Sequence, residues 1–370
     1  MIYYLVTQRH RYTMGSYLDH WARSSSTRFQ IVAYDTLASC TELCAGTYIF
    51  SDLERLFPIE NELCLLLWNQ LRQEEGAVRL LNHAGSVMRR YKLLRTLHAG
   101  GQNFFAAYRI SDMGVPMRFP VFVRQENEHE GSLTPLLNNT QDLDRALVEL
   151  FCRGFGAQEL LIVEFCNTVS QDGIFRKYSA FRIGDQILPR RLIFNLGWMA
   201  KNNSECLINE RHAREEQTYI ETNPHEGWLR TVFAAANIEY GRIDYSFCDG
   251  RPQVWEINTN PTIFLPPDRY HPLHVPAQRL FSVKVGAAFE ALDHVTAAIS
   301  TIRIRIPHDL LNRTAAHRRT IRWRELSRDL TCKARDVFPG KWSQWIKSLM
   351  LKNASRLVDM KTGRHSRHSE

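Results

Sequence analysis

The chain has 370 residues, 44% of them hydrophobic and 23% charged, which suits two or three packed domains of ordinary globular composition. No apolar run approaches the roughly 18 residues that a membrane span requires, and the apolar start of the chain precedes its first basic residues, unlike a signal peptide. The formal net charge is +8, but residues 301–370 alone hold 17 Lys/Arg and 6 Asp/Glu. The basic character therefore belongs to the C-terminal segment. Eight cysteines without CxxC spacing favour reduced, mostly buried thiols in a cytoplasmic protein.

Residues 1–85 alternate strand-like and helix-like segments. Strands are predicted at residues 2–7, 29–34, 47–50 and 78–82, and helices at residues 15–23 and 60–72. This alternation predicts a small α/β domain with a parallel sheet. A helix with leucines at helical spacing follows at residues 87–98, and its basic residues Arg90 and Lys92 are typical of a solvated helix face.

The middle of the chain predicts strands at residues 119–124 and 160–166, separated by a polar loop and a helix at residues 141–153. Glu164 interrupts the second strand, where a buried carboxylate is costly unless it is paired; a strand-end carboxylate facing water is the alternative. Asp172-Gly173 favours a hairpin turn.

Residues 176–194 predict two further strands around a Gly184-Asp185 turn. Lys177 and Arg182 lie on opposite faces of the first of these strands, and the alternation does not decide which of them faces a ligand. Arg190 and Arg191 are interpreted as surface charges. A helix is predicted at residues 223–236, with Asn223 as its N-cap.

Residues 241–261, GRIDYSFCDGRPQVWEINTNP, predict a hairpin with a turn at Asp249-Gly250. Glu256 and Asn258 share one face of the second strand. Asp244 can lie opposite Glu256 only if the loop is odd-numbered or the hairpin contains a bulge, because a regular two-residue turn places Glu256 on the other face. These three oxygen ligands suit Mg²⁺, whereas composition alone favours an edge hairpin with a solvated polar face.

GRID, followed twelve residues after its Asp by a Glu in the string EIN-x-x-P, resembles the C-terminal motif of the ATP-grasp superfamily, as in D-alanine–D-alanine ligases and glutathione synthetases. The resemblance implies a small N-terminal pre-ATP-grasp α/β domain (1–85), a two-lobed ATP-grasp domain (86–300) and a basic helical C-terminal extension (301–370). It also implies ATP as substrate and Mg²⁺, or Mn²⁺, held by Asp244, Glu256 and Asn258. Arg242 would contact the acyl-phosphate or its tetrahedral successor.

The resemblance assigns further roles to positions that precede the hairpin. Arg124 stands where the family usually has a phosphate-binding lysine, and arginine keeps the charge. The following loop offers the backbone of Gly131 and Ser132 to phosphate, although an ordinary surface loop is the alternative. The adenine hinge would comprise Glu164, Phe165 and Cys166. The resemblance further assigns Arg90 or Lys92, and Lys177 or Arg182, to phosphate binding. Asp172 would bind the ribose. Asn260 would contact the substrate, and Arg182 is a second candidate for that contact.

These features predict an ATP-dependent carboxylate–amine, or thiol, ligase that acts through an acyl-phosphate on small-molecule or peptide substrates. A phosphotransferase with the same nucleotide site is a second hypothesis. A non-catalytic binding protein, whose basic C-terminal segment contacts nucleic acid or anionic lipid, is a third hypothesis. Within that segment, residues 341–358 predict an amphipathic helix that suits a partner, an anionic membrane or the protein's own body. The last ten residues, 361–370, are expected to be disordered.

Overall fold

The computed structural model describes residues 1–22, 28–37, 40–74, 76–112, 116–129, 131–293, 301–317 and 319–320. The predicted C-terminal helix and tail lie outside these residues. Within them, no helix combines the length and the apolar character needed to cross a membrane. The seven described cysteines are all free; two are buried, four half-buried and Cys206 exposed, so these thiols are less buried than expected.

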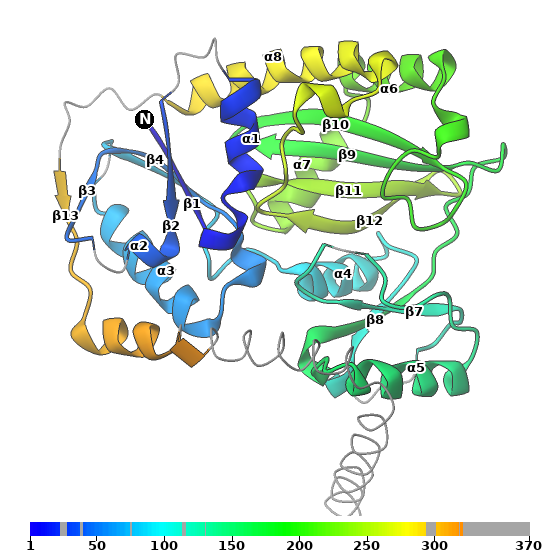
Figure 1. Ribbon diagram of the computed structural model, residues 1–370, viewed down its shortest axis with the longest axis horizontal. Helices are drawn as coiled ribbons and strands as arrows, with labels where there is room; N and C mark the ends of the chain where they lie inside the picture. Colours follow the sequence, from blue (N-terminus) through cyan, green and yellow to red (C-terminus); the bar gives the residue numbers. More distant parts are fainter. Residues whose placement is uncertain are drawn as a thin grey trace, which may run out of the picture.

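A four-stranded parallel sheet forms the N-terminal unit, in the order β2-β1-β4-β5 (Figure 1). Its strands are β1 (Ile2–Val6), β2 (Phe29–Ala33), β4 (Gly46–Phe50) and β5 (Val78–Leu81). The helices of this unit are α1 (Tyr12–His20), α2 (Tyr34–Leu37) and α3 (Pro58–Leu71). The predicted parallel α/β unit is confirmed.

The central strand β1 is buried on both faces, as is typical of a parallel sheet. Tyr3 and Leu5 pack with Leu63 and Leu67 of α3, whereas Tyr4 on the other face packs in a cluster that continues into the large sheet described below. The N-terminal unit and the large sheet therefore share a hydrophobic core.

A small antiparallel sheet follows, in the order β6-β8-β7. Its strands are β6 (Ala107–Arg109), β7 (Val121–Gln125) and β8 (Leu160–Glu164), and its helices are α4 (Arg90–Ala99) and α5 (Thr140–Cys152). Residues of α4 and α5 pack in separate apolar clusters that each include strand residues, so this sheet too is covered on both faces.

The large antiparallel sheet has the order β10-β9-β11-β12. It comprises β9 (Phe175–Ile183), β10 (Gln186–Asn195), β11 (Tyr240–Cys248) and β12 (Arg251–Asn258), with helices α6 (Glu210–Thr222), α7 (Glu226–Ala235) and α8 (Val275–Leu292). The prediction that Asn223 caps the N-terminus of a helix is wrong. Asn223 has φ 47° and ends α6, because asparagine tolerates the left-handed conformation of a helix C-terminus.

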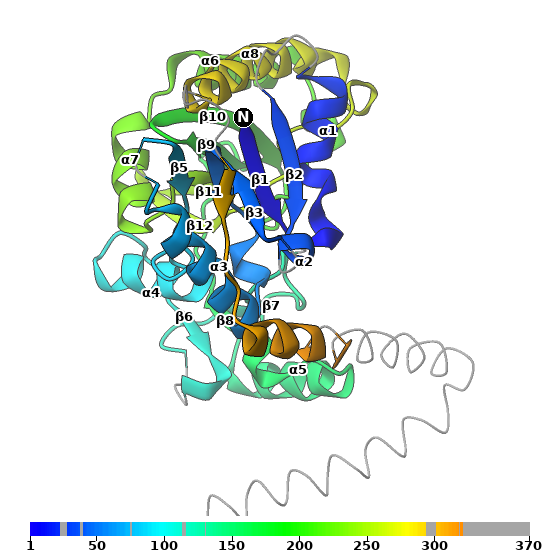
Figure 2. The ribbon, with the colours of Figure 1, turned by 90° about the vertical axis from the view of Figure 1, so that its left-hand side faces the viewer.

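Part of the basic C-terminal segment belongs to the N-terminal unit. Strand β13 (Thr301–Arg303) pairs antiparallel with β3 (Glu42–Cys44), and Figure 2 shows it beside that unit. Ile302, Ile304 and Leu310 are buried in the same cluster as the side chains of α3. The start of the predicted extension is therefore integrated into the N-terminal unit's core.

Asn260, directly after β12, joins the N-terminal unit to the large sheet. Its side-chain oxygen accepts hydrogen bonds from the hydroxyl groups of Tyr4, at 2.7 Å, and Thr13, at 2.5 Å. Asn260 is 2% exposed, and both donors are buried as well. The structure therefore gives this side chain a role in packing, and Asn260 lines neither of the two cavities described below.

Replacing Asn260 with alanine is expected to lower the free energy of unfolding by about 1–3 kcal/mol, because two buried hydroxyl groups lose their acceptor. Urea unfolding measures this change. Asn138→Ala is the matched control, since Asn138 is exposed and its side chain makes no hydrogen bond with the described residues. We expect the control to stay within about 0.5 kcal/mol of the wild type, and equal effects of the two substitutions would contradict the role of Asn260.

Candidate functional site

The β11–β12 hairpin turns tightly and then shifts its register. Asp249 and Gly250, both at positive φ, form a two-residue turn that pairs Cys248 with Arg251. Between Asp244 and Tyr245 the register shifts, so that Asp244 lies opposite Glu256 and Arg242 opposite Asn258. Of the two alternatives that the sequence left open, an odd-numbered loop or a bulge, the structure has the bulge with a two-residue turn. Opposed residues of a pair project from the same face of the sheet.

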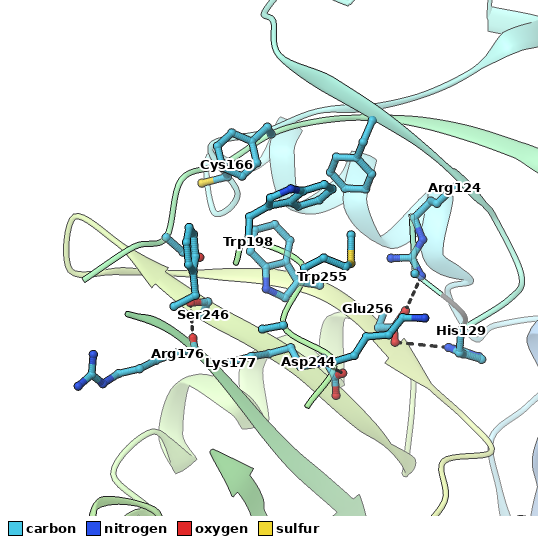
Figure 3. Close-up of a pocket in the computed structure, with 18 residues that line it drawn as sticks. Arg124, His129, Cys166, Arg176, Lys177, Trp198, Asp244, Ser246, Trp255 and Glu256 are labelled. Atoms are coloured by element: carbon cyan, nitrogen blue, oxygen red, sulfur yellow. Dashed lines mark hydrogen bonds and ion pairs between the residues drawn. The ribbon is translucent and has the colours of Figure 1, made fainter. Parts of the chain in front are cut away.

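A cavity of about 110 Å³ lies between the small sheet and this face of the large sheet (Figure 3). Aromatic side chains form much of its wall: Phe122, Phe165, Phe175, Trp198 and Trp255. Charged side chains also face it: Arg124, His129, Arg176, Lys177, Lys201, Asp244 and Glu256. In Figure 3, the two tryptophans lie between Cys166 and the group formed by Arg124, His129 and Glu256. The aromatic side chains suit a flat ring, and the cationic side chains suit an anionic group.

Three cationic groups contact Glu256. Arg90 makes an ion pair with Oε2, an Arg124 Nη atom lies 3.2 Å from Oε2, and Nδ1 of His129 lies 3.4 Å from Oε1. Burial raises the pKa of Glu256, but Arg90, His129 and Arg124 outweigh burial and hold the pKa well below its usual range. Arg90 is only 4% exposed and also donates to the carbonyl groups of Gln125 and Glu128. Arg90 is therefore not on a solvated helix face.

His129 links the cavity to the N-terminal unit. Its Nε2 lies 3.0 Å from Oε1 of Glu54, which belongs to a 3₁₀ turn of that unit. Burial lowers the pKa of His129, but the carboxylates of Glu256 and Glu54 on either side outweigh it and raise the pKa. Burial and the neighbouring Arg90 lower the pKa of Arg124 to about 10. These groups form a buried charge cluster in which carboxylates and cations alternate.

Asp244 is balanced by a separate pair of cations. Nε of Arg242 lies 2.9 Å from Oδ1, and Nζ of Lys177 lies 3.3 Å from Oδ2. Asp244 is buried, whereas Arg242 and Lys177 are half-buried. Between the two residues that the sequence left open, the structure brings Lys177 to the cavity. Arg182 instead donates to the carbonyl groups of Gly184 and Ile238 and lies on no wall of this cavity.

The nucleotide-binding residues predicted from the sequence divide into two groups. Arg124, Gly131, Phe165, Cys166 and Lys177 line the cavity, whereas Glu164 and Ser132 do not.

The two residues outside this wall have partners of their own. The Glu164 carboxylate accepts from Tyr108, the Ala106 N–H and Arg118, and the Ser132 hydroxyl donates to the Thr134 carbonyl oxygen at 2.6 Å. The chain itself therefore satisfies the carboxylate whose burial suggested an adenine contact. The predicted turn at Asp172-Gly173 is present, with Asp172 paired to Arg176.

The three predicted metal ligands form a donor set that fits Mg²⁺. Asp244 and Glu256 oppose each other, and Asn258 follows on the same face of β12, with its Oδ1 accepting the Asn260 N–H at 2.7 Å. Within the described part of the chain, no three His, Cys, Asp or Glu side chains cluster closely enough to hold a metal. An ion at this place would therefore need the amide oxygen and non-protein ligands, which agrees with the preference of Mg²⁺ for water and phosphate oxygens.

A second cavity, of about 190 Å³, adjoins the first. Lys177, Lys201 and Asp244 line both cavities, while Arg190, Arg191 and Arg242 line only the second. The interpretation of Arg190 as a surface charge is wrong: it is 6% exposed and lies over the rings of Phe264 and Phe281. A bulge in β10 between Pro189 and Arg191 brings both neighbouring arginines to the same cavity.

The chain is similar to solved ATP-grasp structures at low identity. The D-alanine–D-alanine ligase from Bacillus anthracis shows 14% identity and a TM-score of 0.43, covering 77% of this chain and 98% of that one. An ATP-grasp RimK domain protein from Sphaerobacter thermophilus shows 15% identity and a TM-score of 0.44, covering 80% of this chain and 100% of that one. An L-amino acid ligase from Bacillus licheniformis shows 11% identity and a TM-score of 0.35, covering 70% of this chain and 66% of that one. No protein-family profile and no curated protein matches the sequence.

With TM-scores below 0.5, the assignment rests on the arrangement of the elements. A parallel α/β unit is followed by two antiparallel sheets that enclose a cavity, with the β7 strand, the segment after β8 and the acidic hairpin contributing in the expected order. This order of elements agrees with the resemblance of the sequence to the ATP-grasp superfamily. No subfamily is identified.

Several residues around the two cavities could not be predicted from the sequence. Trp198 and Lys201 come from an irregular segment after β10, for which periodicity predicts nothing. His129 lines the cavity and contacts Glu54 of the N-terminal unit, a pairing of distant segments that no local pattern predicts. The one local signal was Pro189, because proline inside a strand marks an edge or a bulge, and the bulge it accompanies turns the following arginines toward the second cavity.

Proposed function

We propose that the chain is an ATP-dependent ligase that joins a carboxylate to an amine, or to a thiol, through an acyl-phosphate. The observation that carries this proposal is the shared wall of the two cavities, on which Lys177 and Asp244 face both. ATP in the aromatic cavity would direct its phosphates toward this wall, and a carboxylate in the basic cavity would approach from the other side. Holding the two reactants at one wall lowers the barrier to reaction, because their loss of translational and rotational freedom has already occurred on binding.

The first step is attack by a carboxylate oxygen of the substrate on the γ-phosphorus of ATP, with cleavage of the bond to ADP. Arg124 and Lys177 line the nucleotide cavity and are the candidates to hold the phosphates. Mg²⁺ held by Asp244, Glu256 and Asn258 would offset the negative charge of the phosphates.

The second step is attack by the amine nitrogen on the acyl carbon, followed by loss of phosphate and of the amine proton. Arg242 lines the substrate cavity and would stabilise the oxyanion that forms at the acyl carbon. No side chain near the wall is assigned as a general base, and an amine bound near its own pKa needs little assistance.

Incubation with ATP, Mg²⁺ and pools of carboxylates and amines tests this proposal. A ligase is expected to release ADP and free phosphate in equal amounts, and hydroxylamine should trap the acyl-phosphate as a hydroxamate. ADP together with a stable phosphorylated product would instead indicate a phosphotransferase. Absence of ADP release with every pool would favour a binding protein, and would contradict the ligase.

A further inference from the structure

The second cavity carries a large excess of positive charge. Five cationic side chains line it, namely Lys177, Arg190, Arg191, Lys201 and Arg242, against the single carboxylate of Asp244. That carboxylate is shared by two of the cations, Lys177 and Arg242. Little of the positive charge is therefore neutralised within the cavity.

Among the described residues, no acidic side chain makes an ion pair with the remaining three cations. Arg190 donates to the carbonyl oxygen of Ile263, to the side-chain oxygen of Gln278 and to the hydroxyl of Tyr270, which are all neutral. The side chains of Arg191 and Lys201 make no hydrogen bond or ion pair with any residue that the structure describes. Burial and the neighbouring Arg191 lower the pKa of Arg190 and outweigh Tyr270 and Glu216, which raise it. An anion in the cavity would relieve this repulsion.

Tyr270 adds a directed donor to these charges. Its hydroxyl oxygen accepts from Arg190 at 3.0 Å and from the Leu265 N–H at 2.9 Å. The hydroxyl proton is left with no acceptor among the described residues, and Tyr270 lines the cavity. A phenol whose oxygen accepts two hydrogen bonds in this way can donate a hydrogen bond through its own O–H to an anionic oxygen.

One reacting carboxylate does not account for this arrangement. A carboxylate has a single negative charge, and Arg242 beside the shared wall can form an ion pair with it. Arg191 and Tyr270, which line this cavity and not the first, remain for a second group, and Lys201 lies on the wall that the two cavities share. At about 190 Å³ the cavity has the volume of about six water molecules at roughly 30 Å³ each, so it suits a small molecule or the end of a chain.

We propose that the carboxylate substrate carries a second anionic group, either another carboxylate or a phosphate, which Arg191, Lys201 and Tyr270 recognise. This inference rests on the proposed ligase function for the identity of the cavity as the substrate site. The recognition itself depends only on the charge and on the hydrogen-bond donors of the cavity.

Matched ligand pairs test the inference by calorimetry in the presence of Mg²⁺ and a non-hydrolysable ATP analogue. Aspartate with asparagine and glutamate with glutamine test a second carboxylate, and 3-phosphoglycerate with glycerate tests a phosphate. We expect at least one anionic member to bind about tenfold more tightly than its partner, the effect of one charge-assisted hydrogen bond. Equal binding within every pair would overturn the inference.

Arg191→Gln is expected to weaken the binding of the preferred anionic ligand by about tenfold and to leave the binding of its neutral counterpart unchanged. Arg214→Gln removes an equal charge from the exposed face of α6 and serves as the control. If both variants weaken binding equally, the effect is one of net charge and the inference fails. Thermal unfolding of each variant confirms that it is folded.

Turnover separates this inference from the proposed function. Selective binding of an anionic ligand without ADP release would support the inference and contradict the ligase. ADP release with singly charged carboxylates as efficient as with doubly charged ones would support the ligase and overturn the inference.

Discussion

Replacing Glu256 with glutamine is expected to lower the free energy of unfolding by about 3–5 kcal/mol, the cost of removing one partner from a buried ion pair. Arg90 and Arg124 would keep their charges in a buried site without the carboxylate that both contact. Glutamine has nearly the same shape, so the loss reports charge and not volume. Urea unfolding followed by tryptophan fluorescence measures the change.

Two comparisons make this result specific. Glu210→Gln removes a carboxylate from an exposed pair with Arg214 on α6, where we expect a change of about 0.3–0.5 kcal/mol. Combining Glu256→Gln with Arg90→Met removes both partners, and the double variant should be less destabilised than the sum of the single ones by about 0.5–3 kcal/mol. Additive effects, or a loss of less than about 1 kcal/mol for Glu256→Gln, would show that the cluster is not coupled as described.

The hairpin shows how far a sequence can define this site. The twofold alternation of a strand placed Glu256 and Asn258 together. The requirement that Asp244 join them predicted either an odd-numbered loop or a bulge, and the register contains the bulge. The location of the bulge could not be predicted, because bulges depend on packing around the strand. The bulge also brings Trp255, beside Glu256, to the same cavity.

Contacts between distant segments set the limit of prediction. Glu164 was recognised as a buried carboxylate, but its partner Arg118 lies 46 residues away in the sequence, in the segment before β7. Asn260 resembles a substrate ligand in sequence, yet its acceptor oxygen is used by two hydroxyl groups of the N-terminal unit. Local pattern shows which side chains need partners, whereas the fold decides which partners they find.

The parallel N-terminal sheet could be predicted because its pattern in the sequence is local. Its strands are short apolar runs separated by helices, a local pattern that specifies the connection as well as the element. The pairing of β13 with β3 joins segments more than 250 residues apart and has no such local signal.

Replacing Asp244 with asparagine is expected to reduce the rate of ADP release by about 10²–10³-fold, the range found when one preorganised electrostatic group is removed from a reacting centre. Asp244 is the one carboxylate of the described chain that lines both cavities. Its loss would remove a proposed ligand of Mg²⁺ and free the charges of Lys177 and Arg242 to pair with phosphate. We therefore expect tight ATP binding to survive while turnover falls, and the concentration of Mg²⁺ needed for half-maximal rate to rise by about 10–100-fold.

Asp249→Asn in the same hairpin is the matched control for this change. Asp249 is exposed and at positive φ, a conformation that asparagine tolerates, and the Asn-Gly pair suits the two-residue turn, so rate and stability should stay near those of the wild type. Because Lys177 and Arg242 are half-buried and can turn toward water, Asp244→Asn should destabilise the fold less than Glu256→Gln. Loss of activity with little loss of stability would place Asp244 in the reaction, whereas equal rates for Asp244→Asn and Asp249→Asn would remove the hairpin from catalysis and leave the basic cavity as a binding site alone.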